Sequence, residues 1–166
     1  MTKILSGKQV TKSVYFDLGK RISHLSQDGI TPALAAVIVG NDAASQVYVR
    51  SKTRKFKELG LNAQTISLSG NSTDEEIVSL IKKLNSDVRF HGILVQLPLP
   101  KGIDSGEVLR SVTVEKDVDG FHPENVGLLS SGNPRFIPCT PKGILRILKY
   151  YEIETAGKHA VVVGRS

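Results

Sequence analysis

The chain has 166 residues, of which 40% are hydrophobic and 23% charged, and its formal net charge is +6. This composition fits a folded protein with one domain, or one domain and part of another, and it excludes a disordered chain. The positive charge favours an anionic partner such as a nucleotide, a charged cofactor or a nucleic acid. Aromatic residues make up only 5% of the chain, which argues against a groove that stacks single-stranded bases.

Two features of the chain bear on its compartment. Its single cysteine, Cys139, excludes an intrachain disulfide, and residues 1–10 lack the apolar core of a signal peptide. No apolar run approaches the roughly 20 residues of a membrane helix. We therefore expect a cytoplasmic protein with no membrane partner.

Helix and strand patterns alternate along the first part of the chain. Apolar residues at helical spacing over residues 10–25 predict a first amphipathic helix. The continuous apolar run ALAAVIVG at 33–40 predicts a strand buried on both faces of a parallel sheet. Further strands are predicted at 62–69 and 92–100, with a helix between them that opens at residue 72 or 73. The expected fold is α/β, a mainly parallel sheet flanked by helices.

The helix predicted at residues 46–59 follows the first strand and is rich in cations. Asn41 or Asp42 can cap its start, while Tyr48 and Lys52, four residues apart, share one face. A basic face of this kind is commonly a solvated surface. The alternative is that one lysine lies among other cations, which lowers its pKa and suits it to proton transfer near neutral pH. Both interpretations stay open at this point.

Gln96 lies among apolar neighbours near the end of the strand predicted at 92–100. It is either a satisfied polar group of the sheet or a ligand contact, because open α/β sheets bind ligands at the carboxyl ends of their strands. Residues 114–138 follow no clear periodicity, and long irregular segments in compact domains commonly bind something. Within them, KDVDGFHP predicts an Asp-Gly turn in which Asp117 pairs with Lys116 or caps the turn.

The last part of the chain begins with CTPKGILRILKYYE, a predicted helix with Pro141 at its start. Cys139 is expected to be a small packing residue, because no histidine is placed as its base. Residues 157–166, GKHAVVVGRS, predict an apolar strand that ends at Gly164, which is how a dinucleotide-binding unit begins. The four histidines are scattered and show no metal-ligand spacing, so no metal site is expected.

Five segments follow one another along the chain: YVRSK, GILVQLPLP, KDVDGFHPENVG, PCTPKG and VVVGRS. In this order and at these spacings they resemble the methylenetetrahydrofolate dehydrogenase/cyclohydrolase family of one-carbon folate metabolism. The resemblance runs from about Ser6 to the last residue. It implies a folate-binding catalytic α/β domain at 1–138, then a linker helix and the first strand of an incomplete Rossmann-like NADP-binding domain at 139–166. A homodimer formed through the Rossmann domain is also implied.

The resemblance implies roles for four side chains. The family's catalytic lysine corresponds to Lys52, its partner tyrosine to Tyr48, and the glutamine that assists the lysine to Gln96. The carboxylate that grips the pterin corresponds to Asp119, since one carboxylate can accept from the adjacent N–H and amino groups of that ring. Tyr48 either stacks against the folate or holds Lys52 in place.

The resemblance also implies a reaction and a cofactor. The family oxidises 5,10-methylene-tetrahydrofolate by hydride transfer to NADP and hydrolyses the methenyl product to 10-formyl-tetrahydrofolate. Gly164, Arg165 and Ser166 would meet the NADP, with the Arg-Ser pair at its 2′-phosphate. The chain departs from the usual family pattern at Val114, where a proline is common, and at Arg54, where a lysine is common.

Members of this family are longer than this chain, which we therefore expect to be part of a longer enzyme. Three hypotheses follow. The first is the bifunctional folate enzyme, and the second is a cyclohydrolase that lacks the dehydrogenase activity. The third is a basic module that binds nucleic acid. Against the third stand the low aromatic content and the lack of a groove-reading motif, so no nucleic-acid partner is expected.

Overall fold

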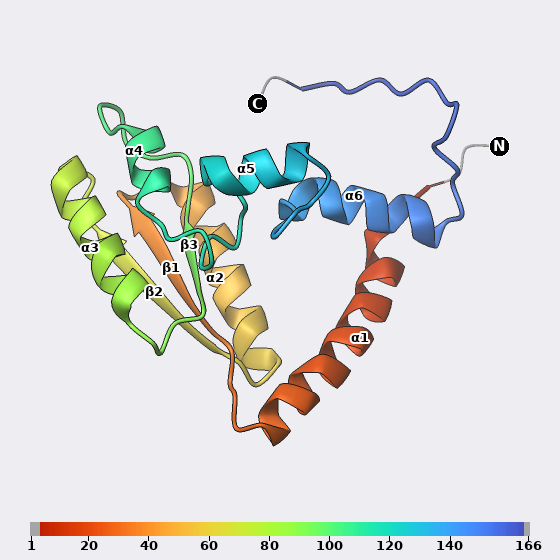
Figure 1. Ribbon diagram of the computed structural model, residues 1–166, viewed down its shortest axis with the longest axis horizontal. Helices are drawn as coiled ribbons and strands as arrows, with labels where there is room; N and C mark the ends of the chain where they lie inside the picture. The colour runs from red at the N-terminus through yellow and green to blue at the C-terminus, as the bar shows by residue number, and fades with distance from the viewer. Residues whose placement is uncertain (1–3, 165–166) are drawn as a thin grey trace.

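The computed structural model of the protein describes residues 4–164. Three parallel strands, β1 (Ala33–Val39), β2 (Asn62–Leu68) and β3 (Gly92–Val95), form a sheet in the order β2-β1-β3 (Figure 1). Helices connect the strands, as parallel pairing requires. The predicted α/β fold, with a parallel sheet flanked by helices, is confirmed.

Six helices lie within the described residues. They are α1 (Gly7–Gln27), α2 (Ala43–Glu58), α3 (Asp74–Ser86), α4 (Ser105–Arg110), α5 (Pro123–Ser130) and α6 (Cys139–Tyr150). Helices α2 and α3 pack on opposite faces of the sheet. In the described part of the chain, no helix has both the length and the apolar character needed to cross a bilayer.

β1 is the centre of the core, since all seven of its residues are buried. Its odd-numbered residues, such as Ala35, pack with Ile77 and Ile81 of α3. Its even-numbered residues, such as Ala36, pack with Val49 of α2. Successive side chains of a strand point to opposite faces of the sheet. One continuous apolar run therefore supplies both halves of the core, as the sequence predicts.

Helices α2 and α3 begin where their polar residues predict. The Asp42 carboxylate accepts from Ser45 N at 2.7 Å, and hydrogen bonding to the side chain and the backbone of Ser45 lowers the pKa of Asp42. Thr73 and Glu76 form a reciprocal capping box, in which each side chain accepts from the other residue's backbone N–H. These side chains satisfy N–H groups that the first turn of a helix leaves free. Both helix starts are thus encoded locally.

The strand predicted at 92–100 is shorter than expected. β3 ends at Val95, and Gln96 donates only one further backbone N–H, to Val37 O at 2.9 Å. Pro98 and Pro100 follow and have no N–H to donate, so they cannot continue a ladder of strand hydrogen bonds. Gln96 therefore lies just beyond the strand instead of inside it.

The segment at 114–138, predicted to be irregular, contains helix α5. Its first residue is Pro123, preceded by His122, whose ring nitrogen Nδ1 accepts from Glu124 N at 3.1 Å. Proline at the first position of a helix is a helix-start signal. Eight residues are too few for the periodicity of apolar residues to reveal the helix.

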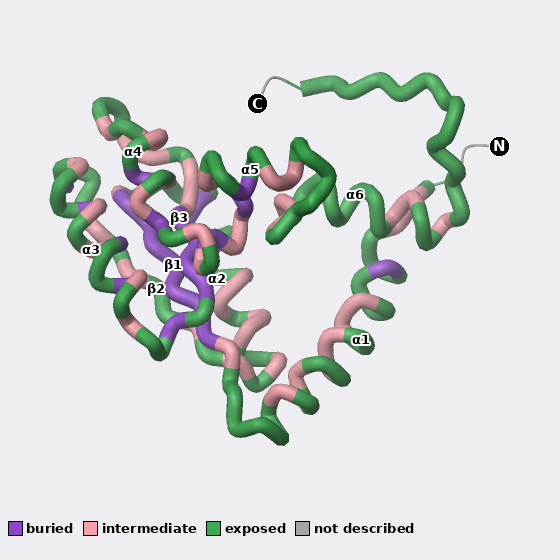
Figure 2. The backbone as a smooth tube through the Cα atoms, viewed as in Figure 1, coloured by how far each residue is buried: buried purple, intermediate pink, exposed green. Residues whose placement is uncertain are grey.

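Helices α1 and α6 are called the outer helices below. α6 has no buried residue, and α1 buries only Val10. Figure 2 shows the buried core gathered in the sheet and its neighbouring helices, while the outer helices and the final segment are mostly exposed. Tyr151, which follows α6, connects the two outer helices, because its hydroxyl accepts from Ser6 N at 3.0 Å.

The strand predicted to end at Gly164 is not formed. Residues 158–164 are irregular, and the side chains of Val162 and Val163 are 94% and 95% exposed. A β-strand needs a neighbouring strand to pair its backbone N–H and C=O groups. No strand among residues 4–164 lies beside this segment, and apolar composition cannot replace that partner.

Candidate active site

The connections that follow the three strands come close together at one edge of the sheet. Gly40, just after β1, has a φ of 80°, and a Cβ there would lie 3.5 Å from Gly70 Cα and 3.6 Å from Pro100 Cγ. Gly70 and Pro100 follow β2 and β3. Open parallel sheets bind ligands at this edge, and here α2 begins and Gln96 lies.

Tyr48 and Lys52 form the best-defined pair of the site. The Lys52 Nζ atom lies 4.4 Å from the centroid of the Tyr48 ring, where the negative face of the ring attracts the ammonium. The Tyr48 side chain is 57% exposed and Lys52 is half-buried. Both groups are therefore accessible to a ligand, and the shared helix face predicted from their spacing is confirmed.

The other cations of α2 do not all gather around Lys52. Arg54 Nε lies 3.7 Å from Glu58 Oε1, and Lys55 forms an ion pair with the same carboxylate. The hydrogen bond from Lys55 holds the pKa of Glu58 below its usual value. Among the described residues, Lys52 has no ion pair within 4 Å. Glu58 thus neutralises part of the positive charge that the sequence predicts along α2.

Gln96 carries an acceptor without a donor. Its Nε2 donates to Leu97 O at 2.7 Å, whereas its Oε1 is buried and accepts no hydrogen bond from the residues that the structure describes. Leaving a buried acceptor unpaired costs on the order of 1–3 kcal/mol. An ammonium or a ligand N–H that reached this oxygen would remove that cost. Gln96 is therefore not the satisfied polar group that one interpretation of the sequence predicts.

Asp119 is half-buried in the turn between β3 and α5. Burial raises the pKa of its carboxyl; the negative charge of Asp117 also raises it, and the Lys52 ammonium lowers it. Among residues 4–164, no donor makes a hydrogen bond to the Asp119 carboxylate. It is therefore partly desolvated and available to accept two N–H groups from a ligand.

The first carboxylate of KDVDG, Asp117, does not pair with Lys116. Its Oδ2 atom accepts from His122 N and from Asn125 Nδ2, both at 2.8 Å. The contact with His122 confirms the alternative that Asp117 caps a turn. Asn125 is fully buried and was missed by the sequence patterns, although Pro123 marks the start of its helix.

Several cavities border the outer helices, and two of them include residues singled out in the sequence. One, of about 550 Å³, lies between α1 and α2 and is lined by Tyr48 and Lys52. The other, of about 600 Å³, lies between α1 and α6 and includes Cys139. Cys139 is exposed, so the prediction that it is a small packing residue is wrong. Gln96 and Asp119 line neither cavity. The structure brings Tyr48 and Lys52 together and places Gln96 at the sheet edge where α2 begins.

Of the three residues predicted to meet NADP, the structure describes only Gly164. Gly164 is exposed at the end of the irregular segment, and Arg165 and Ser166 lie outside the described residues. Within residues 4–164, no group of three or more His, Cys, Asp or Glu side chains is placed to hold a metal ion.

Two family models match the chain. The catalytic domain of tetrahydrofolate dehydrogenase/cyclohydrolase matches residues 5–119, and the NAD(P)-binding domain of the same family matches residues 138–166. The chain belongs to the tetrahydrofolate dehydrogenase/cyclohydrolase family. The resemblance seen in the sequence motifs is thereby confirmed, and the catalytic-domain match includes Tyr48, Lys52, Gln96 and Asp119.

Relatives of the tetrahydrofolate dehydrogenase/cyclohydrolase family match the whole chain. Bifunctional protein FolD of Streptococcus agalactiae is 44% identical over 167 residues, and that of Geotalea daltonii is 48% identical over 166 residues. Each alignment covers 100% of this chain but only 59% of the relative. The chain thus spans well under two thirds of the length of these relatives.

Solved structures of the same family have the same fold. The bifunctional FolD enzyme of Campylobacter jejuni has a TM-score of 0.93 and 44% identity, over 99% of this chain and 58% of that one. FolD of Trypanosoma brucei, solved with NADP and an inhibitor, has a TM-score of 0.89 and 32% identity, over 95% of this chain and 54% of that one. The functions of the individual side chains stay predictions.

Proposed function

We propose that this chain is the folate-binding part of an enzyme that oxidises 5,10-methylene-tetrahydrofolate with NADP and hydrolyses 5,10-methenyl-tetrahydrofolate to 10-formyl-tetrahydrofolate. One observation carries the proposal. Within the stretch that matches the family's catalytic domain, the Lys52 ammonium lies over the Tyr48 ring, and the half-buried Asp119 carboxylate accepts from no described donor. An accessible amine and an available carboxylate in one domain suit a substrate that must be held by one group and must exchange a proton with another.

Asp119 is proposed to bind the pterin. Its two oxygens can accept from an adjacent N–H and amino group, and such charge-assisted pairs also fix the orientation of a ring. The environment of Asp119 supports this role, because burial strengthens hydrogen bonds to a carboxylate by reducing competition from water. Burial raises the pKa of Asp119, and the Lys52 charge acts against this rise and favours the ionised form that accepts both bonds.

Lys52 is proposed to move the proton during hydrolysis. Water adds to the methenyl carbon and loses one proton, which is released. The remaining hydroxyl then gives up its proton to form the formyl C=O as the bond from that carbon to N5 breaks and N5 gains a proton, so the product is neutral. Positioned proton transfer of this kind contributes typically 10²–10⁴-fold in rate. The free Gln96 Oε1 is suited to accept from the amine, and the Tyr48 ring, 4.4 Å from Nζ, is suited to hold it in place.

NADP is the proposed cofactor of the oxidation. The NAD(P)-binding domain match at 138–166 and the Trypanosoma brucei relative solved with NADP support it. Gly164, Arg165 and Ser166 are the residues proposed to meet it. The described part of this region does not form a closed phosphate-binding turn, since residues 158–164 are exposed and irregular.

The domain division proposed is 1–138 for folate binding and catalysis and 139–166 for the linker helix and the start of the cofactor domain. A homodimer and a cytoplasmic location also stay predictions. A cyclohydrolase without dehydrogenase activity is the second candidate. It is favoured by one contrast: Lys52, Gln96 and Asp119 lie in the packed part of the chain, whereas Gly164 is exposed.

The absorbance of methenyl-tetrahydrofolate in the near ultraviolet tests the proposal. The band is expected to decay faster with folded protein than with the same protein after heat denaturation. Folded protein that gives no acceleration would contradict both enzymatic candidates. The appearance of the band from methylene-tetrahydrofolate, only when NADP is added, would separate the bifunctional enzyme from the cyclohydrolase.

A further inference from the structure

The turn that carries Asp119 is attached to the central sheet. Ile93 of β3 donates its backbone N–H to Lys116 O at 2.7 Å, and Ile93 pairs with Asp117 as an isolated parallel bridge. A Cβ at Gly92 would lie 2.4 Å from Val118 Cγ1. The Val118 side chain therefore occupies space that only a glycine at position 92 leaves open.

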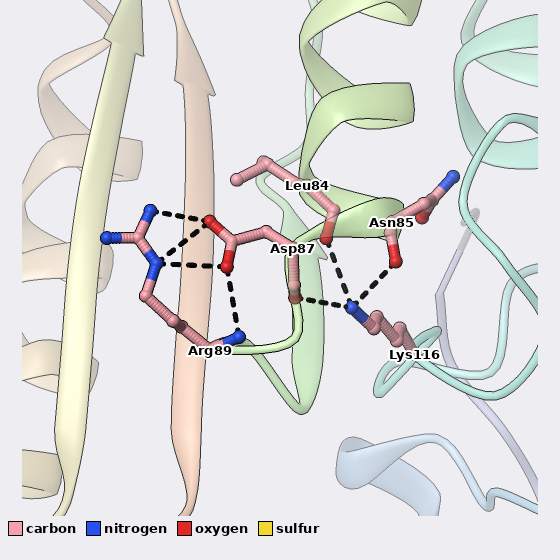
Figure 3. Close-up of polar contacts among 5 residues, drawn as sticks. All are labelled: Leu84, Asn85, Asp87, Arg89 and Lys116. Atoms are coloured by element: carbon pink, nitrogen blue, oxygen red, sulfur yellow. Dashed lines mark hydrogen bonds and ion pairs between the residues drawn. The ribbon is translucent and has the colours of Figure 1, made fainter.

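Lys116 attaches the same turn to the end of α3. Its Nζ donates to Leu84 O at 3.1 Å and to Asn85 O and Asp87 O, both at 2.8 Å (Figure 3). These backbone carbonyls lie in the last turn of α3 and at its C-cap, where a cation is favoured. An ammonium has three N–H groups, so Lys116 keeps no donor for a ligand.

The close-up in Figure 3 also explains why Asp87 does not neutralise Lys116 through its carboxylate. That carboxylate receives hydrogen bonds from the Arg89 side chain and backbone, which lower the pKa of Asp87 to about 2. Only the Asp87 backbone carbonyl faces Lys116. Lys116 is therefore held by backbone carbonyls alone. The positions of these carbonyls are fixed by the end of α3.

Asp117 attaches the turn to the start of α5. Its side chain is only 4% exposed, and its Oδ2 accepts from the backbone N–H of His122, which precedes the helix, and from Asn125 Nδ2. Asn125 is itself fully buried and also donates to Val114 O at 3.0 Å. A buried carboxylate needs such donors. Its hydrogen bonds hold the protein together and do not reach a ligand.

The side chains of Lys116, Asp117 and Val118 are each held by neighbouring parts of the protein. The Asp119 carboxylate, in contrast, accepts no hydrogen bond from a described donor. We propose that Asp117 is a positioning residue for Asp119: by tying the turn to α5, it directs the Asp119 carboxylate toward the pterin. This inference rests on the proposed function, in which Asp119 binds folate. Only Val118 separates the two residues, so a shift of the Asp117 backbone also moves the backbone of Asp119.

The experiment compares tetrahydrofolate binding by Asp117→Ala and Asp117→Asn, with Kd corrected for the folded fraction measured by circular dichroism. Asp117→Ala removes both hydrogen bonds and is expected to weaken binding by about tenfold. Asp117→Asn keeps an oxygen that can accept both bonds, so its Kd is expected to stay within about threefold of the wild type. Asp104→Ala removes a capping carboxylate from α4 and is the matched control, with an unchanged Kd.

A double-mutant cycle separates positioning from general damage. If Asp117 acts through Asp119, Asp117→Ala has no further effect on Kd in an Asp119→Ala background. Equal weakening in both backgrounds, or an unchanged Kd for Asp117→Ala in the wild-type background, would overturn the inference.

A second measurement needs no folate. Amide hydrogen exchange in the turn that carries Asp119 is expected to be faster in Asp117→Ala than in Asp117→Asn, because only the alanine variant loses both hydrogen bonds that tie the turn to α5. Wild-type protein that binds no tetrahydrofolate would contradict the proposed function, and this comparison then tests the inference by itself. Equal exchange rates in the two variants would overturn it.

Discussion

The sheet with helices α2–α5 is called the sheet unit below. Its helices and the outer helices have similar amphipathic sequences, but their apolar residues are buried in the sheet unit and largely exposed in the outer helices. In the sheet unit, α3 buries Ile77, Ile81 and Leu84. In α6 the apolar residues also recur at helical spacing, yet Ile144 and Leu145 are 54% and 58% exposed. An amphipathic pattern therefore shows which face of a helix is able to be buried, but a packing partner decides whether it is buried.

The same contrast separates the proposed functional residues. Lys52, Gln96 and Asp119 all belong to the sheet unit. Lys52 lies over the Tyr48 ring, the Gln96 Oε1 atom is buried, and burial raises the pKa of Asp119. Gly164, proposed for the cofactor, lies in an exposed segment beyond the outer helices. The side chains that this chain holds in fixed positions are thus those of the sheet unit. Variants in the sheet unit should therefore affect activity, binding and stability more than variants in the outer helices.

The largest difference is expected in catalysis. Lys52→Met should slow methenyl-tetrahydrofolate hydrolysis by about 10²–10⁴-fold, because it removes the proposed proton carrier. The Kd for tetrahydrofolate should change little, since Asp119 is proposed to hold the ring. Stopped-flow absorbance and calorimetry measure the two quantities. Lys149→Met, an exposed change in α6, is the control in the outer helices, and a comparable loss of rate there would break the contrast.

Core packing gives the next largest effect. Ile77 is fully buried between α3 and the sheet. Ile77→Ala should lower the free energy of unfolding by about 2–5 kcal/mol, as expected for a deleted isoleucine side chain and the cavity that it leaves. Urea denaturation followed by circular dichroism measures this value. A loss below about 1 kcal/mol would show that the sheet unit is no more tightly packed than the outer helices.

Folate affinity is expected to depend on Asp119. Asp119→Ala should weaken tetrahydrofolate binding by about 10- to 100-fold, the usual size for losing hydrogen bonds to a charged group. Isothermal titration calorimetry checks it. Glu154→Ala, which removes an exposed carboxylate after α6, controls for net charge. Equal affinity of Asp119→Ala and the wild type would show that the pterin is held elsewhere.

A smaller effect of Asp119 is expected on stability. Burial raises the pKa of this carboxyl above its ordinary value of 3.8, so the ionised form destabilises the folded state once the pH exceeds the folded-state pKa. Asp119→Asn should therefore raise the melting temperature at pH 7 by at most a few degrees. The gain should shrink as the pH falls toward 3.8, where the wild-type carboxyl becomes protonated. Thermal melts from pH 7 to pH 4 test the sign.

The smallest effect is expected in the outer helices. Leu145 is 58% exposed, so Leu145→Ala should change the free energy of unfolding by no more than about 0.5 kcal/mol. Urea denaturation under the conditions used for Ile77→Ala gives the comparison. A loss of similar size for the two variants would mean that α6 buries this residue against a partner in solution.

Much of the sheet unit could be predicted from the sequence because its information is local. The strand at 33–39 follows from one apolar run, and the starts of α2 and α3 follow from Asp42 and Thr73. The contact between Tyr48 and Lys52 follows from their four-residue spacing on a helix. The family resemblance added candidate roles for these residues, which no local pattern contains.

The sequence by itself determined the strand and helix types, the helix caps and the face that carries Lys52, because each depends on neighbours within a few residues. Only the tertiary structure decided that Asp117 binds His122 and Asn125, that Gln96 Oε1 stays unpaired, and that residues 158–164 form no strand. These features depend on groups distant in the chain or on partner strands. Hydrogen bonds and burial are properties of pairs, and a pattern in one segment records only one member of each pair.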